Sequence, residues 1–128
     1  MAVIPIGKSI YEVDSNMREA SQRGEGHGMA TPMTYFWFYK QVRNHGKWDY
    51  KQEGSSYQNF GNFNFGATGI AAGIPEEMLH RGAGCAQQRA GTSLPEWNNC
   101  FGDFPYGDDP HDQFWIKQGI DYAKKHGY

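Results

Sequence analysis

Aromatic side chains supply most of the bulk from which this chain can build a core. The sequence contains 8 Phe, 8 Tyr and 4 Trp in 128 residues, while hydrophobic residues of all kinds make up only 38%. A chain of this length buries roughly two-thirds of its unfolded surface, which is enough for one core. Disordered chains are poor in aromatic residues, and a membrane-spanning helix needs about 20 consecutive apolar residues, which this sequence lacks. We therefore expect a single compact domain without membrane insertion.

Capping residues and helical periodicity predict most of the chain to be helical. Ser9 and Glu12 fit a capping box that opens the first helix. Thr31 and Pro32 open the second, whose nearly continuous aromatic run at 35–39 indicates burial on most sides. The expected helices cover about 9–23, 31–43, 66–73, 75–90 and 109–126.

A short hairpin is predicted between the second and third of these helices. Apolar and polar residues alternate over Trp48–Gln52, and Ser56–Phe60 could pair with this segment across a turn. We therefore predict a mainly α fold with a small β-hairpin (α+β) in one compact domain. Within it, residues 1–30 would form a capped helix and a Gly-rich link, and residues 31–128 the core of the domain.

Charge is distributed unevenly along a chain whose net charge is only −2. The stretch Glu96–Asp112 carries five acids and no Lys or Arg. A basic stretch lies near the middle, formed by Lys40, Arg43, Lys47 and Lys51. Either stretch can be a plain solvated face or a functional one, but the chain lacks the strongly basic overall character typical of nucleic-acid-binding domains.

Two cysteines, Cys85 and Cys100, allow one intramolecular disulfide. Neither belongs to a Cys-x-x-Cys motif, so a zinc site is not expected. The alternatives are two buried thiols, or a disulfide that closes a loop of about 15 residues and stabilises the fold by about 3 kcal/mol. A disulfide would imply an oxidising compartment.

Two clusters of polar residues carry the candidate chemistry. No HExxH, nucleophile elbow, phosphate-binding loop or dinucleotide-binding motif occurs, and we expect no metal and no cofactor. The first cluster interleaves rings with charges and amides, as binding of a polar substrate with apolar faces requires; the alternative is a core hairpin with Asn at turns. Its candidate catalytic residues are Asp49 and Lys51, and its candidate substrate-binding residues are Trp48, Tyr50, Gln52, Asn59, Asn62 and Asn64.

The second cluster is the sequence GDDPHDQ at 107–113. Asp109 and Asp112 are its candidate catalytic acids, and His111 is a candidate substrate-binding residue. Neighbouring carboxylates can hold one acid with a raised pKa beside an ionised one, can bind a hard metal ion, or can simply cap a helix. A carboxylate of the first cluster facing one of the second would suit cleavage of a glycosidic bond.

Three ordered motifs give the chain a resemblance to a known family. The segments 46–52 (GKWDYKQ), 57–69 (YQNFGNFNFGATG) and 107–120 (GDDPHDQFWIKQGI) together resemble the polymorphic toxin type 44 domain, also called bacterial toxin 44. Such domains are typically the C-terminal cargo of large bacterial secreted proteins, including type VI secretion effectors. The resemblance therefore implies an antibacterial effector toxin delivered into a target bacterium. It also implies as partners a cognate immunity protein and the secretion machinery or parent effector protein.

The resemblance gives the biological role better than the reaction, so three functions stay open. A peptidoglycan hydrolase working in the periplasm by carboxylate acid–base chemistry suits the sequence pI of 6.2, the abundant rings and the clustered acids. A ribonuclease working in the cytoplasm suits Lys51 with His45 and Arg43. A non-enzymatic toxin would bind and block a partner. We favour the peptidoglycan hydrolase.

Overall fold

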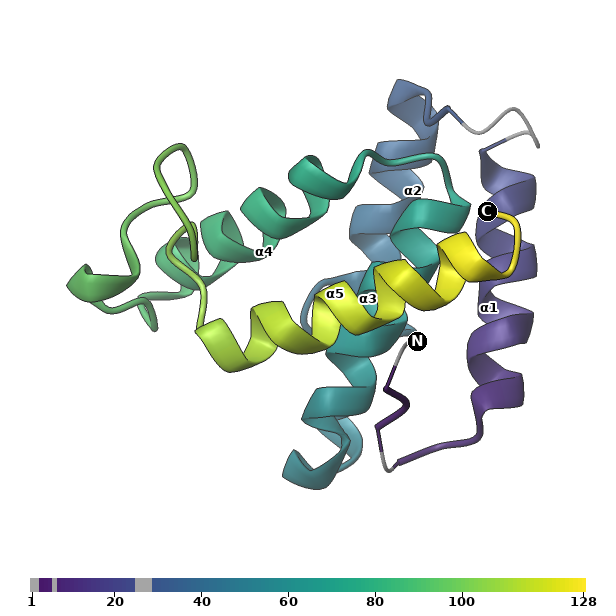
Figure 1. The fold of residues 1–128 in the computed structure, drawn as a ribbon, viewed down its shortest axis with the longest axis horizontal. Helices are drawn as coiled ribbons and strands as arrows, with labels where there is room; N and C mark the ends of the chain where they lie inside the picture. Colours follow the sequence, from purple (N-terminus) through teal and green to yellow (C-terminus); the bar gives the residue numbers. More distant parts are fainter. Residues whose placement is uncertain (1–2, 6, 25–28) are drawn as a thin grey trace.

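Helices form the secondary structure of this chain (Figure 1). The computed structural model describes residues 3–5, 7–24 and 29–128. Most of the predicted Gly-rich link, residues 25–28, lies outside these described residues. The α-helices are α1 (Ile10–Arg23), α2 (Pro32–Val42), α3 (Gln58–Ala71), α4 (Glu76–Ala90) and α5 (Pro110–Lys125), and the 3-10 helices are η1 (Tyr50–Glu53), η2 (Ser55–Tyr57) and η3 (Pro95–Trp97).

The predicted starts of α1, α2 and α5 are confirmed, and each of these three is fixed by a side-chain cap. Ser9 Oγ accepts a hydrogen bond from the Tyr11 amide at 3.1 Å at the start of α1. The reciprocal contact of Glu12 that the predicted capping box requires is not formed in the part of the chain that the structure describes. Thr31 caps α2 in a reciprocal capping box with Thr34. Asp109 caps α5 by accepting from the His111 amide at 2.9 Å.

The predicted β-hairpin is wrong, and among the described residues there is no strand. Residues 50–57 form η1 and η2, and α3 runs unbroken from Gln58 to Ala71, so it includes most of the short helix predicted at 66–73. Trp48 and Tyr50 alternate with polar neighbours because both rings enter the helical core, not because the segment is pleated. The Tyr50 ring packs edge-on against Phe60 at a centroid distance of 5.0 Å. A lone hairpin is only marginally stable, whereas these rings gain burial against Phe60 of α3 and Trp37 of α2.

Helix α3 lies at the centre and is crossed closely by α5, which runs over it in Figure 1. Two glycines allow this approach. A Cβ added to Gly66 would collide with the carbonyl group of Ile116, and one added to Gly119 would collide with the carbonyl group of Phe63. Helix α1 packs on α3 as well, and its Val13, Met17 and Ala20 belong to the same core as Phe60, Phe63, Ile116 and Ile120.

Helix α2 is far less buried than its aromatic run predicts, so that expectation is wrong. Of its side chains, Thr34 and Phe38 are buried. Phe36 and Tyr39 are 57% and 55% exposed. The helix therefore contacts the core along a narrow stripe and leaves much of its aromatic surface uncovered.

Helix α4 and the loop 92–108 extend from the crossing of α3 and α5 (Figure 1). Cys85 of α4 and Cys100 of the loop form a disulfide, which is the second of the two alternatives that the sequence left open. Within the described residues, no helix is both long enough and apolar enough to span a membrane.

Candidate functional site

The first turn of α5 gathers three acidic side chains. Asp108 precedes the helix, Asp109 is its N-cap, and Asp112 lies in its first turn. Asp108 and Asp112 are only 2% and 6% exposed, whereas Asp109 is partly exposed. The positive end of the helix dipole favours anions here, but burial of two carboxylates side by side opposes ionisation.

Neutral amides, rather than cations, hold the two buried acids. Gln87 Nε2 of α4 bridges them, at 3.1 Å from Asp108 Oδ1 and 3.3 Å from Asp112 Oδ2. Gln58, the first residue of α3, donates from Nε2 to Asp112 Oδ1 at 3.1 Å. Gln113 donates from Nε2 to Asp108 Oδ2 at 2.7 Å. In the part of the chain that the structure describes, neither acid has an ion-pair partner.

Because no cation compensates this burial, the acids resist losing their protons. Burial raises the pKa of Asp112 to about 6, and the negative charges of Asp108 and Asp109 add to the effect. Burial also raises the pKa of Asp108, against the opposing effect of its hydrogen bonds from Gln113 and Gln87. Asp112 is therefore a carboxyl group that gains and loses a proton near neutral pH, which is the property required of an acid–base catalyst.

Gln113 connects this acid cluster to His80 of α4. Gln113 Nε2 donates to two acceptors, Asp108 Oδ2 and the carbonyl oxygen of His80, which is 3.1 Å away. The other amide atom, Gln113 Oε1, must therefore be the one that lies 2.6 Å from His80 Nδ1. Since Oε1 can only accept, Nδ1 carries the proton. The other ring nitrogen, Nε2, then carries the lone pair of the neutral ring and can accept a hydrogen bond.

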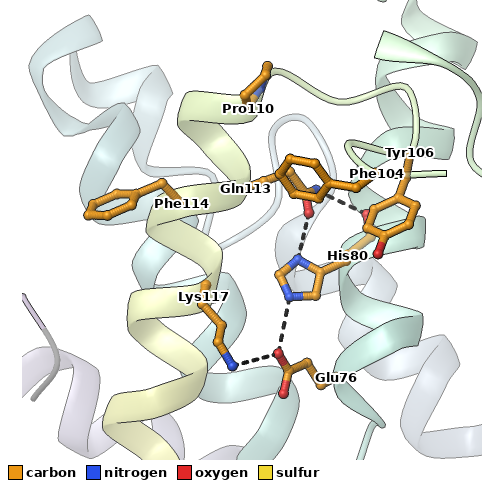
Figure 2. Close-up of a pocket in the computed structure, with 8 residues that line it drawn as sticks. All are labelled: Glu76, His80, Phe104, Tyr106, Pro110, Gln113, Phe114 and Lys117. Carbon is orange, nitrogen blue, oxygen red and sulfur yellow. Dashed lines mark hydrogen bonds and ion pairs between the residues drawn. The ribbon is translucent and has the colours of Figure 1, made fainter.

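His80 Nε2 faces a cleft of about 480 Å³ between α4 and α5 (Figure 2). Glu76 Oε2 lies 3.5 Å from Nε2 and 2.9 Å from Lys117 Nζ. Partial burial raises the pKa of Glu76, but hydrogen bonds from Lys124 and Lys117 outweigh this and bring the pKa to about 2. The remaining lining residues are Phe104, Tyr106, Pro110, Gln113 and Phe114.

The loop 92–108 forms the aromatic wall of this cleft and is anchored to α4. Besides the disulfide, Arg81 Nη1 donates to the carbonyl oxygens of Cys100 and Gly102 at 3.0 and 2.8 Å. The Arg81 guanidinium also lies over the Tyr106 ring, 4.7 Å from its centroid. These contacts hold Phe104 and Tyr106 opposite α5.

The structure places the candidate residues of the first sequence cluster outside this site. Trp48, Tyr50 and Asn64 lie in the core, and Asn16 Nδ2 donates to both Tyr50 Oη and Asn64 Oδ1. Asp49 accepts from the His45 amide at 2.8 Å and so closes a local turn. Lys51 and Gln52 are exposed on η1, and Asn59 and Asn62 are half-buried on α3.

Of the second cluster, Asp109 and Asp112 share the first turn of α5, as predicted from their spacing. His111 is exposed there, and its Nε2 lies 3.4 Å from Trp115 Nε1, which donates to it. Sequence reasoning missed the amides of Gln58, Gln87 and Gln113 and the whole cleft around His80. Glu76 and His80 are four residues apart on one helix, which is the only local signal for the cleft. Among the described residues, no three potential ligands are grouped so as to hold a metal ion.

The sequence model of the bacterial toxin 44 family matches residues 50–125, more than half of the chain. The chain belongs to the bacterial toxin 44 family. The resemblance seen in the three sequence motifs is thereby confirmed. The matched segment includes η1, η2, α3, α4 and α5, and with them the acid cluster and the cleft, but not α1 or α2. No curated protein and no solved structure matches the chain.

Membership of this family makes the chain a bacterial toxin domain, and implies a secreted effector with an immunity protein as its partner. Membership of the family does not define the substrate of the toxin. The substrate must therefore be argued from the chemistry of the site.

Proposed function

We propose that this toxin domain hydrolyses peptidoglycan, with Asp112 as the carboxyl group that transfers the proton. One observation carries the proposal: Asp112 is a buried acid with a pKa of about 6, held beside a second buried acid by neutral amides. If this position served only packing or capping, an amide side chain there would give a more stable fold, because buried carboxylates without a compensating cation are destabilising. Perturbed acids of this kind are concentrated at functional sites.

The surrounding charge favours this substrate over a polyanion. Five acidic side chains lie around the first turns of α4 and α5 or along α5: Glu76, Asp108, Asp109, Asp112 and Asp121. Lys117 and Lys124 of α5 are already paired with carboxylates. A phosphate backbone would be repelled here, because proteins bind it with exposed, unpaired cations. Glycan hydroxyls and peptide amides carry no such charge and suit the amides and rings of the site.

The cleft and the acids flank the same turn, so one extended substrate can reach both. Pro110 and Gln113 line the cleft and are chain neighbours of Asp109 and Asp112. The exposed Phe104 and Phe114 offer faces for sugar rings or peptide side chains. Gln58 is an exposed side chain on Asp112 Oδ1, and its rotation would open that oxygen to substrate. Protonated Asp112 would then donate to the leaving group while Asp109 assists the attacking water.

A ribonuclease is the second candidate, and the cleft supplies the observation that favours it. His80 Nε2 lies near the ammonium group of Lys117 with Tyr106 beside it, which is a suitable set for proton transfer next to a phosphate and a stacked base. The ionised Glu76 between His80 and Lys117 counts against it.

Parallel digestion separates the two candidates. Purified toxin is incubated with peptidoglycan sacculi and with total RNA, as the wild type and as Asp112→Asn, with Asp103→Asn as the control because Asp103 is an exposed acid of the loop. We expect wild type and Asp103→Asn to release soluble fragments from sacculi, and Asp112→Asn to be slower by about 100-fold or more. Rapid RNA breakdown with intact sacculi would replace this proposal with the ribonuclease. Intact substrates in both arms, with toxicity retained, would indicate a binding toxin.

A further inference from the structure

Helix α2 presents apolar and basic side chains that the rest of the described chain leaves uncovered. We call the surface formed by Met33, Phe36, Tyr39, Lys40 and Arg43 the α2 face. All five side chains are exposed, and Met33 is the most exposed of the three apolar ones at 75%. Such a concentration of large apolar groups on one short helix is typical of a surface that binds a partner.

Cations on and beside the α2 face are stacked on rings of α2 rather than paired with acids. Lys40 Nζ lies 4.7 Å from the centroid of the Phe36 ring, and the Arg43 guanidinium lies 5.9 Å from that of Tyr39. Arg23, at the end of α1, lies 5.3 Å from the Trp37 ring. None of the three cations forms an ion pair with a carboxylate within the ranges that the structure describes. Their hydrogen-bond donors are therefore available to an incoming anionic group.

A groove of about 390 Å³ runs beside these side chains, between the end of α1 and α2. Its lining includes Arg23, Trp37 and Lys40 together with Met33 and Phe36. A groove with apolar walls and two cations suits a carboxylate-bearing or aromatic side chain of a partner. Aromatic residues and Arg are also the types that most often dominate the binding energy of protein interfaces.

The charge of the segment selects an acidic partner. From Met29 to Lys47 the sequence contains Lys40, Arg43 and Lys47 and no Asp or Glu. A membrane-surface helix separates an apolar face from a basic one, whereas here each ring carries its own cation. A single-stranded nucleic acid stacks its bases on open ring faces, but Lys40, Arg43 and Arg23 already cover faces of these rings. An acidic protein surface is the occupant that satisfies both the free cations and the exposed ring edges.

We propose that the α2 face docks an acidic surface of the immunity protein that neutralises this toxin. The inference rests on membership of the toxin family and on the α2 geometry, and is independent of the reaction at Asp112. Helix α2 lies outside the residues that the family model matches. A surface there can distinguish this toxin from other members that share the matched segment, as a cognate partner must do.

Charge reversal on the α2 face tests the proposal in the full chain. The double variant Lys40→Glu/Arg43→Glu is compared with Arg89→Glu/Lys125→Glu, which makes the same change in net charge at exposed positions on α4 and α5. The cognate immunity protein is titrated into each by calorimetry. We expect the α2 variant to bind roughly 30-fold or more weakly than wild type, and the control to bind within about threefold. In cells, the α2 variant should remain toxic and escape neutralisation.

Equal binding of the immunity protein by both double variants would overturn the proposal. A membrane or nucleic-acid partner would also overturn it. In that case wild type would bind phosphatidylglycerol-containing vesicles or single-stranded RNA, and the α2 variant would lose this binding while keeping the wild-type affinity for the immunity protein. Circular dichroism is used to confirm that each variant is folded. The single variant Phe36→Ala provides a second check without charge reversal, and it should bind the immunity protein roughly tenfold more weakly than wild type. Wild-type affinity in this variant would contradict the proposed docking surface.

Discussion

The acid cluster on α5 and the α2 face are built in opposite ways. Asp108 and Asp112 are buried, touch neutral amides and lie in the segment that the toxin family shares. Lys40 and Arg43 are exposed, lie over rings and belong to a helix outside that segment. Burying charge without a counter-charge is destabilising, so it is retained where chemistry uses it, whereas exposed charge costs little and serves recognition. The difference supports the proposal that reaction and partner recognition occupy separate parts of this small domain.

The largest effect is expected where the acid-bearing helix crosses the core. Gly119→Ala should lower the free energy of unfolding by more than about 3 kcal/mol, because the new Cβ would collide with the carbonyl group of Phe63. Gly82→Ala on α4 is the matched control, since an added Cβ there meets nothing within 4 Å. It should be neutral or stabilise by up to about 1 kcal/mol. Urea denaturation measures both. Equal effects of the two variants would show that the crossing does not determine the position of α5.

The next largest effect on stability is expected from the disulfide, which lies on the side of the molecule that carries the acid cluster. Replacing Cys85 and Cys100 together by Ala should lower the free energy of unfolding by about 2–4 kcal/mol, because the bridge closes a loop with a sequence separation of 15 residues. Mass spectrometry without reductant should show the loss of two protons relative to the dithiol. Two thiols that alkylate readily in native protein from an oxidising preparation would contradict the bridge and weaken the case for a periplasmic target.

Asp112 should make the free energy of unfolding fall as the pH rises. Its pKa is about 6 in the folded chain, against 3.8 for an unperturbed Asp. The native state therefore holds this proton longer than the unfolded state as the pH rises. The contribution of Asp112 is most favourable below about pH 4, declines between pH 4 and 6, and stays low above pH 6. The size of the decline should be about 1–3 kcal/mol.

Denaturation curves of wild type and Asp112→Asn, recorded from pH 4 to 7, isolate this contribution from that of other groups. Glu76 acts with the opposite sign, because its lowered pKa stabilises the fold above pH 4.5 and its contribution declines as the pH falls toward 2. The difference between the two proteins should grow from pH 4 to 6 in favour of the variant. A constant difference would mean that Asp112 is not perturbed.

The smallest effect is expected on the α2 face. Phe36→Ala should change the free energy of unfolding by no more than about 0.5 kcal/mol, because the ring is mostly exposed. Phe38→Ala, two residues away, removes a buried ring and should lower it by about 3–5 kcal/mol. Thermal or urea denaturation of the pair measures the contrast. If Phe36 contributed as much as Phe38, the α2 face would belong to the core and not to a binding surface.

Local signals predicted most of the helices and the family, but not the first half of α3 or the way in which the site is assembled. Ser9, Thr31 and Asp109 mark helix starts that the structure confirms, because capping depends on a few adjacent residues. The strand predicted from the alternation around Trp48 and Tyr50 is wrong, because burial of two rings in a helical core and pleating of a strand give the same pattern over five residues. For α2, periodicity could not show how many neighbours were available to cover its rings.

The acids of the site were predicted because Asp109 and Asp112 are close in sequence. Their partners were not, because Gln58 and Gln87 come from α3 and α4, and only the fold brings these amides to α5. The same reason applies to His80, whose proton position depends on Gln113 from a different helix. Contacts between distant helices leave no spacing in the sequence that could be read.

The central claim is that Asp112 is retained for chemistry and not for stability, and Asp112→Asn tests it in a single preparation. Its unfolding free energy at pH 7 and its release of fragments from sacculi are measured together, with Asp103→Asn as the control. We predict a variant as stable as wild type, or more stable by up to about 2 kcal/mol, with the hydrolytic activity lost. A variant that digests sacculi at the wild-type rate, or one that loses activity only because it unfolds, would contradict the claim.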